Sequence, residues 1–396
     1  MFSKQIFVYK NNAYDRKNTV RIKNQKSTYF KQLKLNIIAL KLFGVMPLTE
    51  DENGPKFKLF SWIMLYSFSI FVCLICLLFN KLYGDYRYYS ESSDLDIFNF
   101  TSRIAGSAMT LVVFTIPFFW MDMKNIPNYW NRWNIFEDKF ESCMRKPLHL
   151  NVTKRSWIVT ILPIVLITSN IGISVTLIKV WKVANSILFI TIFAIINLSV
   201  GYFHINCHIF RNISKDINQR LMELIVTKKS AIKFREHAEL WCYMSHMITD
   251  FGIVHGGMFC STAIVMYISS TITLFVVFMI LISPESYKVS PILLPATFSS
   301  SILMIYSESA YTALSEIGPK LRWKILNLIV CGVVEQTQRE VQDFLEIIQL
   351  CRTNITFGGY CNVNRELFLN FLFAVIFNLI VAFQSQILPK QLVSSE

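Results

Sequence analysis

The chain has 396 residues, of which 53% are hydrophobic, and its formal net charge is +13 at pH 7. A soluble domain of this length has no use for so much apolar surface, so the composition excludes an ordinary globular domain and predicts a membrane protein. The basic residues are spread over loops beside apolar segments. This pattern favours attraction to anionic lipid of the inner leaflet over nucleic-acid binding.

Seven apolar runs recur along the chain. A run of about 20 residues at a rise of ~1.5 Å per residue crosses a hydrocarbon core of ~30 Å, so each run predicts a transmembrane helix. The fifth run is too long for one crossing and too short for two, so we expect part of it to project into the cytosol. The runs are Leu59–Phe79, Ile97–Trp120, Trp157–Ile178, Val183–Phe203, Phe251–Ser283, Val289–Ser307 and Leu367–Leu388.

The Lys and Arg residues divide unequally between the two sides of this pattern. Of the 39, 32 fall on the side that includes the amino terminus and 7 fall on the other. The positive-inside rule places the richer side in the cytosol, so we expect a cytosolic N-terminus and an extracellular C-terminus in the plasma membrane. The predicted fold is an all-α membrane protein with seven transmembrane helices. This orientation is opposite to that of a G-protein-coupled receptor.

The outward-facing loops leave no room for an extracellular domain. Residues 179–182 and 284–288 are little more than turns, so any ligand has to be a small molecule that enters between the outer ends of the helices. We therefore divide the chain into a cytosolic segment (1–58), six transmembrane helices with a ligand pocket in their outer half (59–316), cytosolic anchor helices (317–366), and a last transmembrane helix with a short outer tail (367–396).

The cytosolic connection before the last apolar run carries an amphipathic stripe. Gly318-Pro319 breaks the chain ahead of it. We expect a cytosolic bundle in which inward extensions of spans four to six meet the helix that bears the stripe, and this bundle is an oligomer anchor if several subunits contribute. The stripe consists of Val341, Phe344, Leu345 and Ile348, at the i, i+3, i+4, i+7 spacing of a helix.

No enzyme signature, cofactor motif or metal site stands out in the chain. His204 and His208 are spaced i, i+4, as two metal ligands on a helix are. No acidic or cysteine partner stands at helical spacing on that face, so we interpret them as an ordinary pair at a helix end. Clusters of His, Asp or Glu inside the spans, which a membrane enzyme needs, are nearly absent. We expect no enzymatic activity, no cofactor and no bound metal.

Polar and aromatic residues gather at the outer ends of the second to fourth spans. Arg103 is either a hydrogen-bond donor to a ligand or a side chain that snorkels to the outer headgroups. An aromatic face with amide and hydroxyl groups suits a small polar ligand such as a sugar, whereas an interfacial Trp belt accounts for the same pattern. The candidate ligand-binding residues are Arg103, Asn170, Thr176, Trp181 and Asn185.

The last apolar run has polar residues near its outer end. Amides in hydrocarbon are costly unless they face a polar cavity or a partner. The helix therefore either lines a water-filled path at the axis of an oligomer or forms hydrogen bonds with neighbouring helices. The candidate pore-lining residues are Asn378, Gln384 and Ser385.

The C-terminal part of the chain resembles a known family. The stretch Gly358–Leu367, followed by a span that contains Phe377–Ser385, is similar to the C-terminus of insect gustatory receptors. The family signature there is Thr-Tyr, five hydrophobic residues, Gln and Phe. Gln384 and the five hydrophobic residues are in register with it. The departures are Phe377 and Asn378 in place of Thr-Tyr, and Ser385 in place of Phe.

Two further segments extend the resemblance. Phe43–Pro47, just before the first span, is similar to the family's entry segment, and Trp120 with Trp130–Glu137 resembles its sugar-sensing branch. The resemblance implies a ligand-gated, nonselective cation channel. It also implies that four identical or related subunits surround a pore lined by the last helix, with a pocket for a small tastant among the outer halves of spans two to six.

Two alternatives stay open. An odorant receptor of the same superfamily shares the whole architecture. A secondary transporter for small solutes often shows an internal repeat, and none is visible in this chain. In each case the expected partners are a small molecule and membrane lipid, without nucleic acid.

Overall fold

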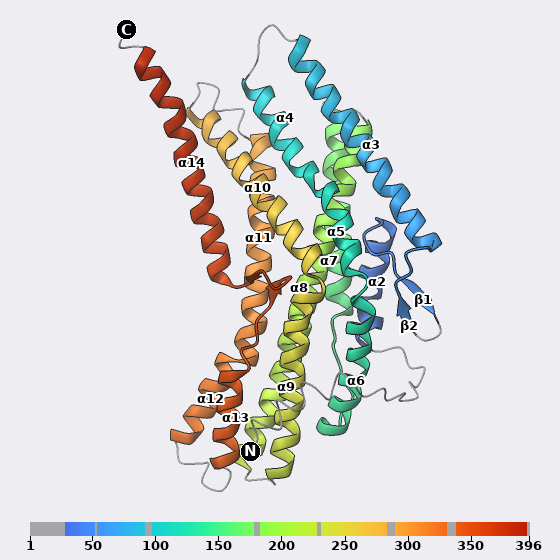
Figure 1. Ribbon diagram of the computed structural model, residues 1–396, viewed down its shortest axis with the longest axis vertical. Coiled ribbons are helices and arrows are strands. Elements are labelled where there is room, and N and C mark those ends of the chain that lie inside the picture. Colours follow the sequence, from blue (N-terminus) through green and yellow to red (C-terminus); the bar gives the residue numbers. More distant parts are fainter. Residues whose placement is uncertain are drawn as a thin grey trace.

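The computed structural model describes residues 28–51, 54–91, 97–177, 183–227, 231–282, 290–330 and 338–393. They form an elongated bundle of helices (Figure 1). In chain order these are α2 (Thr28–Leu42), α3 (Trp62–Glu91), α4 (Ile97–Thr110), the 3-10 helix η1 (Leu111–Thr115), α5 (Ile116–Asp122), α6 (Ile126–Met144), α7 (Thr153–Leu177), α8 (Val183–Val226), α9 (Ala231–Val254), α10 (Gly256–Ile282), α11 (Ser290–Ile317), α12 (Pro319–Val330), α13 (Gln338–Leu350) and α14 (Arg365–Val393).

Two short antiparallel strand pairs lie beside the helices. β1 (Thr49–Asp51) pairs with β2 (Gly54–Lys56) ahead of α3, and β3 (Thr356–Phe357) pairs with β4 (Cys361–Asn362) directly ahead of α14. In the second pair the turn needs left-handed backbone, which glycine adopts without strain: Gly358 has φ 62° and Gly359 has φ 84°. The architecture is therefore helical, as predicted.

Several helices are long and apolar enough to cross a membrane. Within the described ranges, Trp62–Glu91, Asn185–Val226 and Gly256–Phe278 qualify singly, and Gly106–Asp122 qualifies together with Ile126–Met144, across a bend of 56°. The first turn of α6 contains a proline. Proline lacks the backbone N–H of an ordinary residue, so it suits the start of a new helix at this bend. These findings support a membrane protein. The count of seven spans and the orientation of the termini stay predictions.

The helix ends differ from the predicted spans in a consistent way. α3 continues to Glu91 although its apolar run ends at Phe79, and α8 continues to Val226 although its run ends at Phe203. Hydropathy marks the part of a helix that suits lipid. Beyond Phe203, α8 continues with an apolar face that packs in the core, with Phe210, Ile217 and Leu221 buried. Gly318 does separate α11 from α12, as predicted.

The fifth predicted span is two helices rather than one straight element. The chain turns at His255, between α9 and α10. The N–H groups of Gly257 and Met258 donate to the carboxylate of Asp122, at 3.2 and 2.8 Å, instead of to the preceding turn. Asp122 thus caps the start of α10 from the end of α5.

The core is one continuous apolar cluster with Phe251 of α9 at its centre. The Phe251 ring centroid lies 5.7 Å from that of Phe203 and 5.2 Å from that of Phe210, both on α8, and 5.3 Å from that of Phe259 on α10. All four side chains are buried. Interlocked rings of this kind hold the inner part of the bundle together.

The predicted stripe on α13 is covered within the same chain. The Phe344 ring packs edge-on against Phe234 and Trp241 of α9, with centroids 5.6 and 5.4 Å apart. Val341 and Ile348 are also buried. α13 packs against α9 and α12, and the stripe is used inside the protomer; the cytosolic location of these helices stays a prediction. Burial of the stripe therefore does not depend on other subunits.

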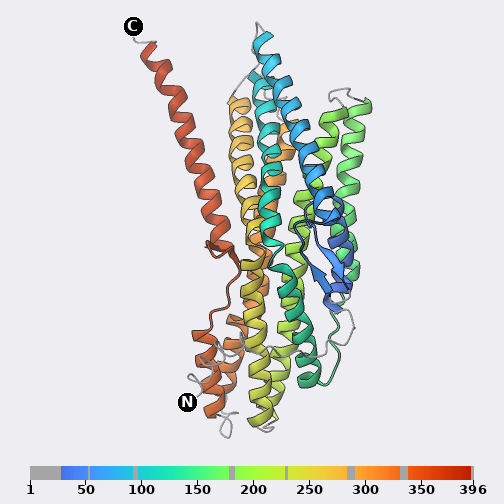
Figure 2. The same ribbon diagram turned by 45° about the vertical axis from the view of Figure 1, so that its right-hand side comes forward.

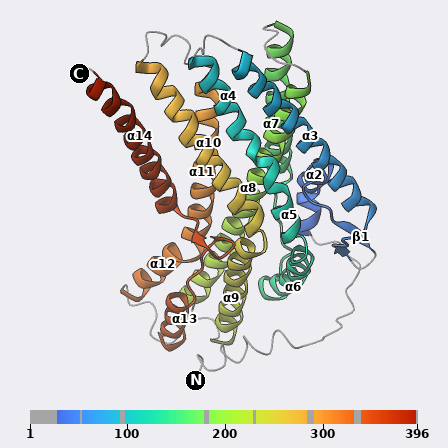
Figure 3. The ribbon, with the colours of Figure 1, turned by 45° about the horizontal axis from the view of Figure 1, so that its top comes forward.

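α14 stands at the edge of the bundle. It contacts α10 and α11, and its upper part leans away from the other helices (Figure 1, Figure 2 and Figure 3). Large apolar side chains along it are exposed. These are Leu369, Leu372, Phe373, Ile376, Phe377, Ile380 and Val381.

Candidate functional site

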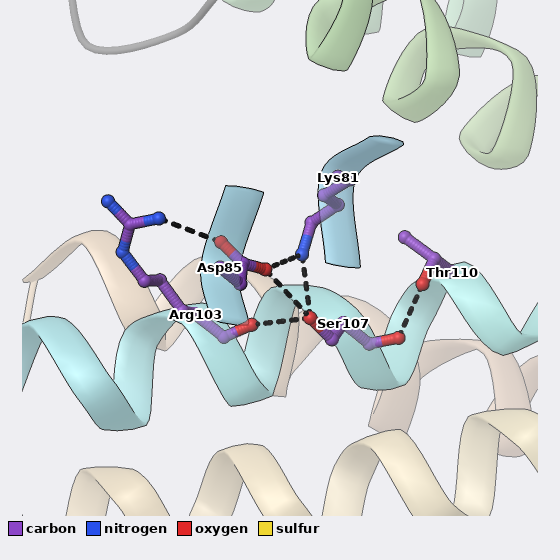
Figure 4. A network of polar contacts seen from close by, with 5 residues as sticks. All are labelled: Lys81, Asp85, Arg103, Ser107 and Thr110. Carbon is purple, nitrogen blue, oxygen red and sulfur yellow. Dashed lines mark hydrogen bonds and ion pairs between the residues drawn. The ribbon is translucent and has the colours of Figure 1, made fainter. Parts of the chain in front are cut away.

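A network of charged and hydroxyl side chains joins α3 to α4 near the end of the bundle that is predicted to face outside (Figure 4). The Lys81 ammonium lies 2.7 Å from Oδ2 of Asp85 and 2.6 Å from Oγ of Ser107. Arg103 donates to Oδ1 of the same carboxylate at 2.7 Å. One carboxylate on α3 therefore holds two cations, of which one comes from each helix.

Because the network is largely buried, it constrains the position of α3 relative to α4. The Lys81 side chain is 7% exposed and that of Asp85 is 13% exposed. Removing one partner of a buried ion pair leaves the other charge uncompensated. Two cations share one anion, so the cluster keeps one excess positive charge, and it offers Arg103, whose side chain is 39% exposed, to the surroundings.

The sequence left two interpretations of Arg103, and the structure adds a third. Its guanidinium pairs with Asp85 and lies over the ring of Tyr88, 4.1 Å from the centroid. Sequence reasoning missed Asp85 and Lys81 because both follow the end of the first apolar run and were assigned to a loop. The signal was available: Lys81 and Asp85 are spaced i, i+4, as in a helical ion pair.

The remaining candidate ligand residues are described unevenly. Asn185 lies near the start of α8 and is half-buried, and α8 contacts α4, which bears Arg103. Asn170 and Thr176 belong to α7, and nothing is described of their side chains. Trp181 lies outside the described residues. Arg103 is thus the member of the predicted set with described ionic partners.

The three candidate pore residues lie on α14. Asn378 is exposed and donates to the hydroxyl of Tyr267 on α10, at 3.0 Å. Gln384 is exposed, six residues or about 1.7 turns further along. Ser385 follows it in the helix, with its side chain outside the described set. The amide of Asn378 therefore has a partner within the chain.

The base of α14 is fastened to α11. Arg365 forms two parallel hydrogen bonds with the carboxylate of Glu308, both 2.8 Å long, and its guanidinium lies 3.8 Å from the ring centroid of Tyr311. Asn364 caps the helix by accepting from the N–H of Leu367 at 2.9 Å. Such bidentate geometry fixes direction as well as distance.

Glycines bring the β3–β4 turn into contact with α9 and α10. Gly358 donates its N–H to the carbonyl of Gly252 at 3.1 Å. A Cβ on Gly256 would come 2.1 Å from the Cα of Gly358, and one on Gly252 would come 2.4 Å from the carbonyl oxygen of Thr356. No side chain fits at either position. The segment that leads into α14 is therefore pressed against the turn between α9 and α10.

Together, these features define a helical membrane protein with an ion network toward one end. Its last helix stands at the edge of the bundle and is fastened at its base. The family model described as "7tm Chemosensory receptor" matches residues 33–388, and the chain belongs to this family. The family is one of receptors, so the chain is not an enzyme. The resemblance to insect gustatory and odorant receptors is confirmed.

The relatives in this family are distant in sequence. "Gustatory and odorant receptor 22" of Anopheles gambiae is 22% identical over 360 residues, which are 88% of this chain and 76% of the relative. "Gustatory and odorant receptor 21a" of Drosophila melanogaster is 21% identical over 355 residues, which are 87% and 78% of the two chains.

A solved structure shares the fold. The insect olfactory receptor OR5 from Machilis hrabei superimposes with a TM-score of 0.64 at 12% sequence identity, covering 90% of this chain and 98% of that one. Its complex with eugenol gives a TM-score of 0.60 over the same shares. At this level of identity the likeness concerns the fold alone.

Proposed function

We propose that this chemosensory receptor acts as a ligand-gated, nonselective cation channel of the gustatory type in the plasma membrane. The observation that supports the proposal is the exposed surface of α14 at the edge of the bundle. Its contacts run to α10 and α11, and it presents a row of exposed apolar residues together with an exposed amide, Gln384. A helix with this composition suits a place between subunits, with its polar side toward an aqueous path.

The channel activity is tested by recording currents from cells that express the chain at their surface. A panel of sugars, bitter compounds and eugenol covers the candidate ligands. We expect a ligand-evoked current that reverses near 0 mV in solutions of mixed monovalent cations. Uptake of a ligand without such a current would instead support the transporter alternative. A response to eugenol with none to sugars would support the odorant alternative.

The proposed orientation has the N-terminus in the cytosol and the C-terminus outside. It is supported by the charge division of 32 against 7 basic residues. Epitope tags at both ends, stained in cells before and after permeabilisation, provide the test. The C-terminal tag is expected to stain in intact cells. Staining of the N-terminal tag alone would overturn the orientation.

We propose a tetramer of identical or related subunits, held by the cytosolic helices and by α14. Phe344 is covered inside the protomer, so the exposed Trp323 on α12 is the better probe of assembly. Trp323→Glu is expected to reduce the tetramer fraction in mass photometry and to leave the protomer folded. Phe344→Glu serves as the contrast, since it should disrupt the protomer itself. A wild-type monomer in mild detergent would count against the tetramer.

The proposed ligand is a small polar molecule, a sugar or another tastant, held in the outer half of the bundle. The polar network at Asp85 and Arg103 supports a polar rather than purely apolar pocket. The solved complex of the OR5 receptor with eugenol supports a small molecule in this fold. Trp130 and Trp133, from the stretch that resembles the sugar-sensing branch, are buried in the core. Packing accounts for these two residues, so they add no support for a sugar.

The residues proposed to line the pocket are tested together. If they bind the ligand, the loss of one hydrogen bond costs about 1–3 kcal/mol, which shifts the effective concentration roughly 5- to 150-fold. An unmoved dose–response curve after alanine substitution at every position would place the pocket elsewhere. The positions are Arg103, Asn170, Thr176, Trp181 and Asn185.

A further inference from the structure

Helices α7, α8 and α11 pack in this order, and we call the strip of surface that they form together the groove. α8 contacts α7 on one side and α11 on the other. The part-buried His204 of α8 bonds through Nδ1 to Oγ of Ser309 on α11, at 2.8 Å. The positive charge of Arg155, in the first turn of α7, acts on the rings of both His204 and His208. Side chains of α8 and α11 thus meet here, and Arg155 of α7 lies near enough for its charge to act on both rings.

The groove is rich in cations. The charges of Arg211 and Lys215, further along α8, also act on His208. The carboxylates nearby are engaged: Glu316 with Lys320 and Arg211, and Asp216 with Lys146. In the part of the chain described here, Arg155 and Lys215 are exposed and form no ion pair. Positive charge therefore remains available to an anion.

The same groove continues into an apolar surface. Ile158 and Leu162 follow Arg155 at i+3 and i+7 on α7, and both are exposed. On α11, Ile305 precedes Ser309 by one turn and is also exposed. The cationic end lies where predicted spans three, four and six meet the cytosol. A molecule that fits has an anionic head at the membrane surface and an apolar tail within the membrane.

We propose that this groove binds one anionic phospholipid of the inner leaflet. Arg155 of α7 and Lys215 of α8 hold the headgroup phosphate. The acyl chains lie along Ile158, Leu162 and Ile305. The guanidinium suits a phosphate because its N–H donors match two oxygens at once. Free phosphate satisfies the cations but leaves the apolar walls exposed, so lipid is the better occupant.

The test is native mass spectrometry of the intact receptor in neutral detergent. Phosphatidylserine and phosphatidylcholine with identical acyl chains are added in turn. Wild-type protein is expected to retain phosphatidylserine in preference. Arg155→Gln should weaken this retention about fivefold, and Arg155→Gln combined with Lys215→Gln about 25-fold, because each basic contact with an anionic lipid contributes about that factor.

The matched control is Lys324→Gln. Lys324 is exposed on α12, which is not one of the three helices that form the groove, and its substitution removes the same charge. The control should retain phosphatidylserine as the wild type does. An equal loss in the control and in Arg155→Gln would mean that the attraction is spread over the whole basic surface, and this result would overturn the site. Equal retention of the two lipids by the wild type would overturn it as well.

Two further measurements keep the result interpretable. Inorganic phosphate at millimolar concentration should leave phosphatidylserine bound. Complete displacement would show an anion site without a lipid contribution and would overturn the proposal. Arg155→Lys covers the case in which Arg155→Gln fails to fold. The lysine keeps the positive charge but lacks the paired N–H donors. This variant should therefore bind phosphatidylserine more weakly than the wild type does, while still preferring phosphatidylserine to phosphatidylcholine.

Discussion

The two halves of the bundle, called inner and outer after the predicted orientation, are held together by different forces. Around Phe251 the inner half is a set of interlocked rings without exposed surface. Toward the other end, α3 is joined to α4 by the ion network of Lys81, Asp85 and Arg103. Along the apolar part of α3, 17% of the residues are buried. The outer contact therefore depends on a few directional bonds.

The difference suggests how a ligand acts on such a molecule. Dense aromatic packing has no room to rearrange without creating voids. Ion pairs and hydrogen bonds, in contrast, exchange partners when a polar molecule offers equivalent ones. We infer that the outer half rearranges on binding and that the inner half moves as one body.

The largest effect is expected at the centre of the inner half. Phe251→Ala removes a fully buried ring and leaves a cavity among Phe203, Phe210 and Phe259, so we expect a loss of about 3–5 kcal/mol in stability. Thermal unfolding of the purified receptor, followed by size-exclusion chromatography, measures it. Phe377→Ala is the control, because this exposed ring on α14 contributes little to the protomer. Similar losses in both variants would mean that the inner half has no special packing.

The next largest effect is expected at Asp85. Asp85→Asn leaves the buried Lys81 ammonium and Arg103 without their shared anion, at a cost of about 3 kcal/mol in the same unfolding assay. Glu91→Gln is matched to it on the same helix: the pair of Glu91 with Arg87 is exposed, and its loss should cost less than about 1 kcal/mol. If Asp85→Asn is as stable as Glu91→Gln, the network does not hold the outer half.

A moderate effect is expected where the turn ahead of α14 meets α10. Gly256→Ala would bring a methyl group against Gly358, and we expect a cost of about 1–3 kcal/mol and a weaker ligand-evoked current. Gly84→Ala is the control, since a Cβ there meets no atom within 4 Å. Alanine at this helical position should stabilise α3 by about 0.5–1 kcal/mol. Normal gating in Gly256→Ala would separate this contact from the opening of the channel.

The smallest effect on stability is expected at Gln384. Gln384→Glu changes an exposed side chain, so the unfolding temperature should hardly move, while a ring of carboxylates should raise the divalent share of the current. Gln384→Asn keeps the neutral amide and should leave permeability unchanged. In parallel, Gln384→Cys should react with a charged thiol reagent applied from outside. If it stays unreactive and Gln384→Glu leaves permeability unchanged, the side chain serves packing instead.

The sequence predicted the helices more reliably than their ends. Apolar runs identify the part of a helix that suits lipid, so α8 was expected from Val183, and its inward extension, which ends at Val226, was expected as well. The continuation of α3 to Glu91 was not. The turn at His255 was also missed. It depends on the Asp122 carboxylate, which lies far away in sequence and reaches Gly257 through the fold.

The candidate residues show the same limit. Periodicity correctly indicated a buried face on α13 that meets inward extensions of the spans, but it did not show that Phe234 and Trp241 of α9 are the residues that cover Phe344. Arg103 was recognised as unusual, whereas its partner Asp85 was assigned to a loop. A pattern within one segment shows that a side chain needs a partner. Only the fold shows which partner it has.

The attachment of α14 has a mechanical consequence. The helix is 29 residues long and is fastened at its base through Arg365 and Glu308, whereas its upper part leans outward (Figure 2). At ~1.5 Å per residue it is a lever of about 44 Å. A tilt of about 5° at the base would carry its far end about 4 Å, more than the width of a water molecule. A small tilt at the base is thus enough to change the width of the proposed pore at the opposite end.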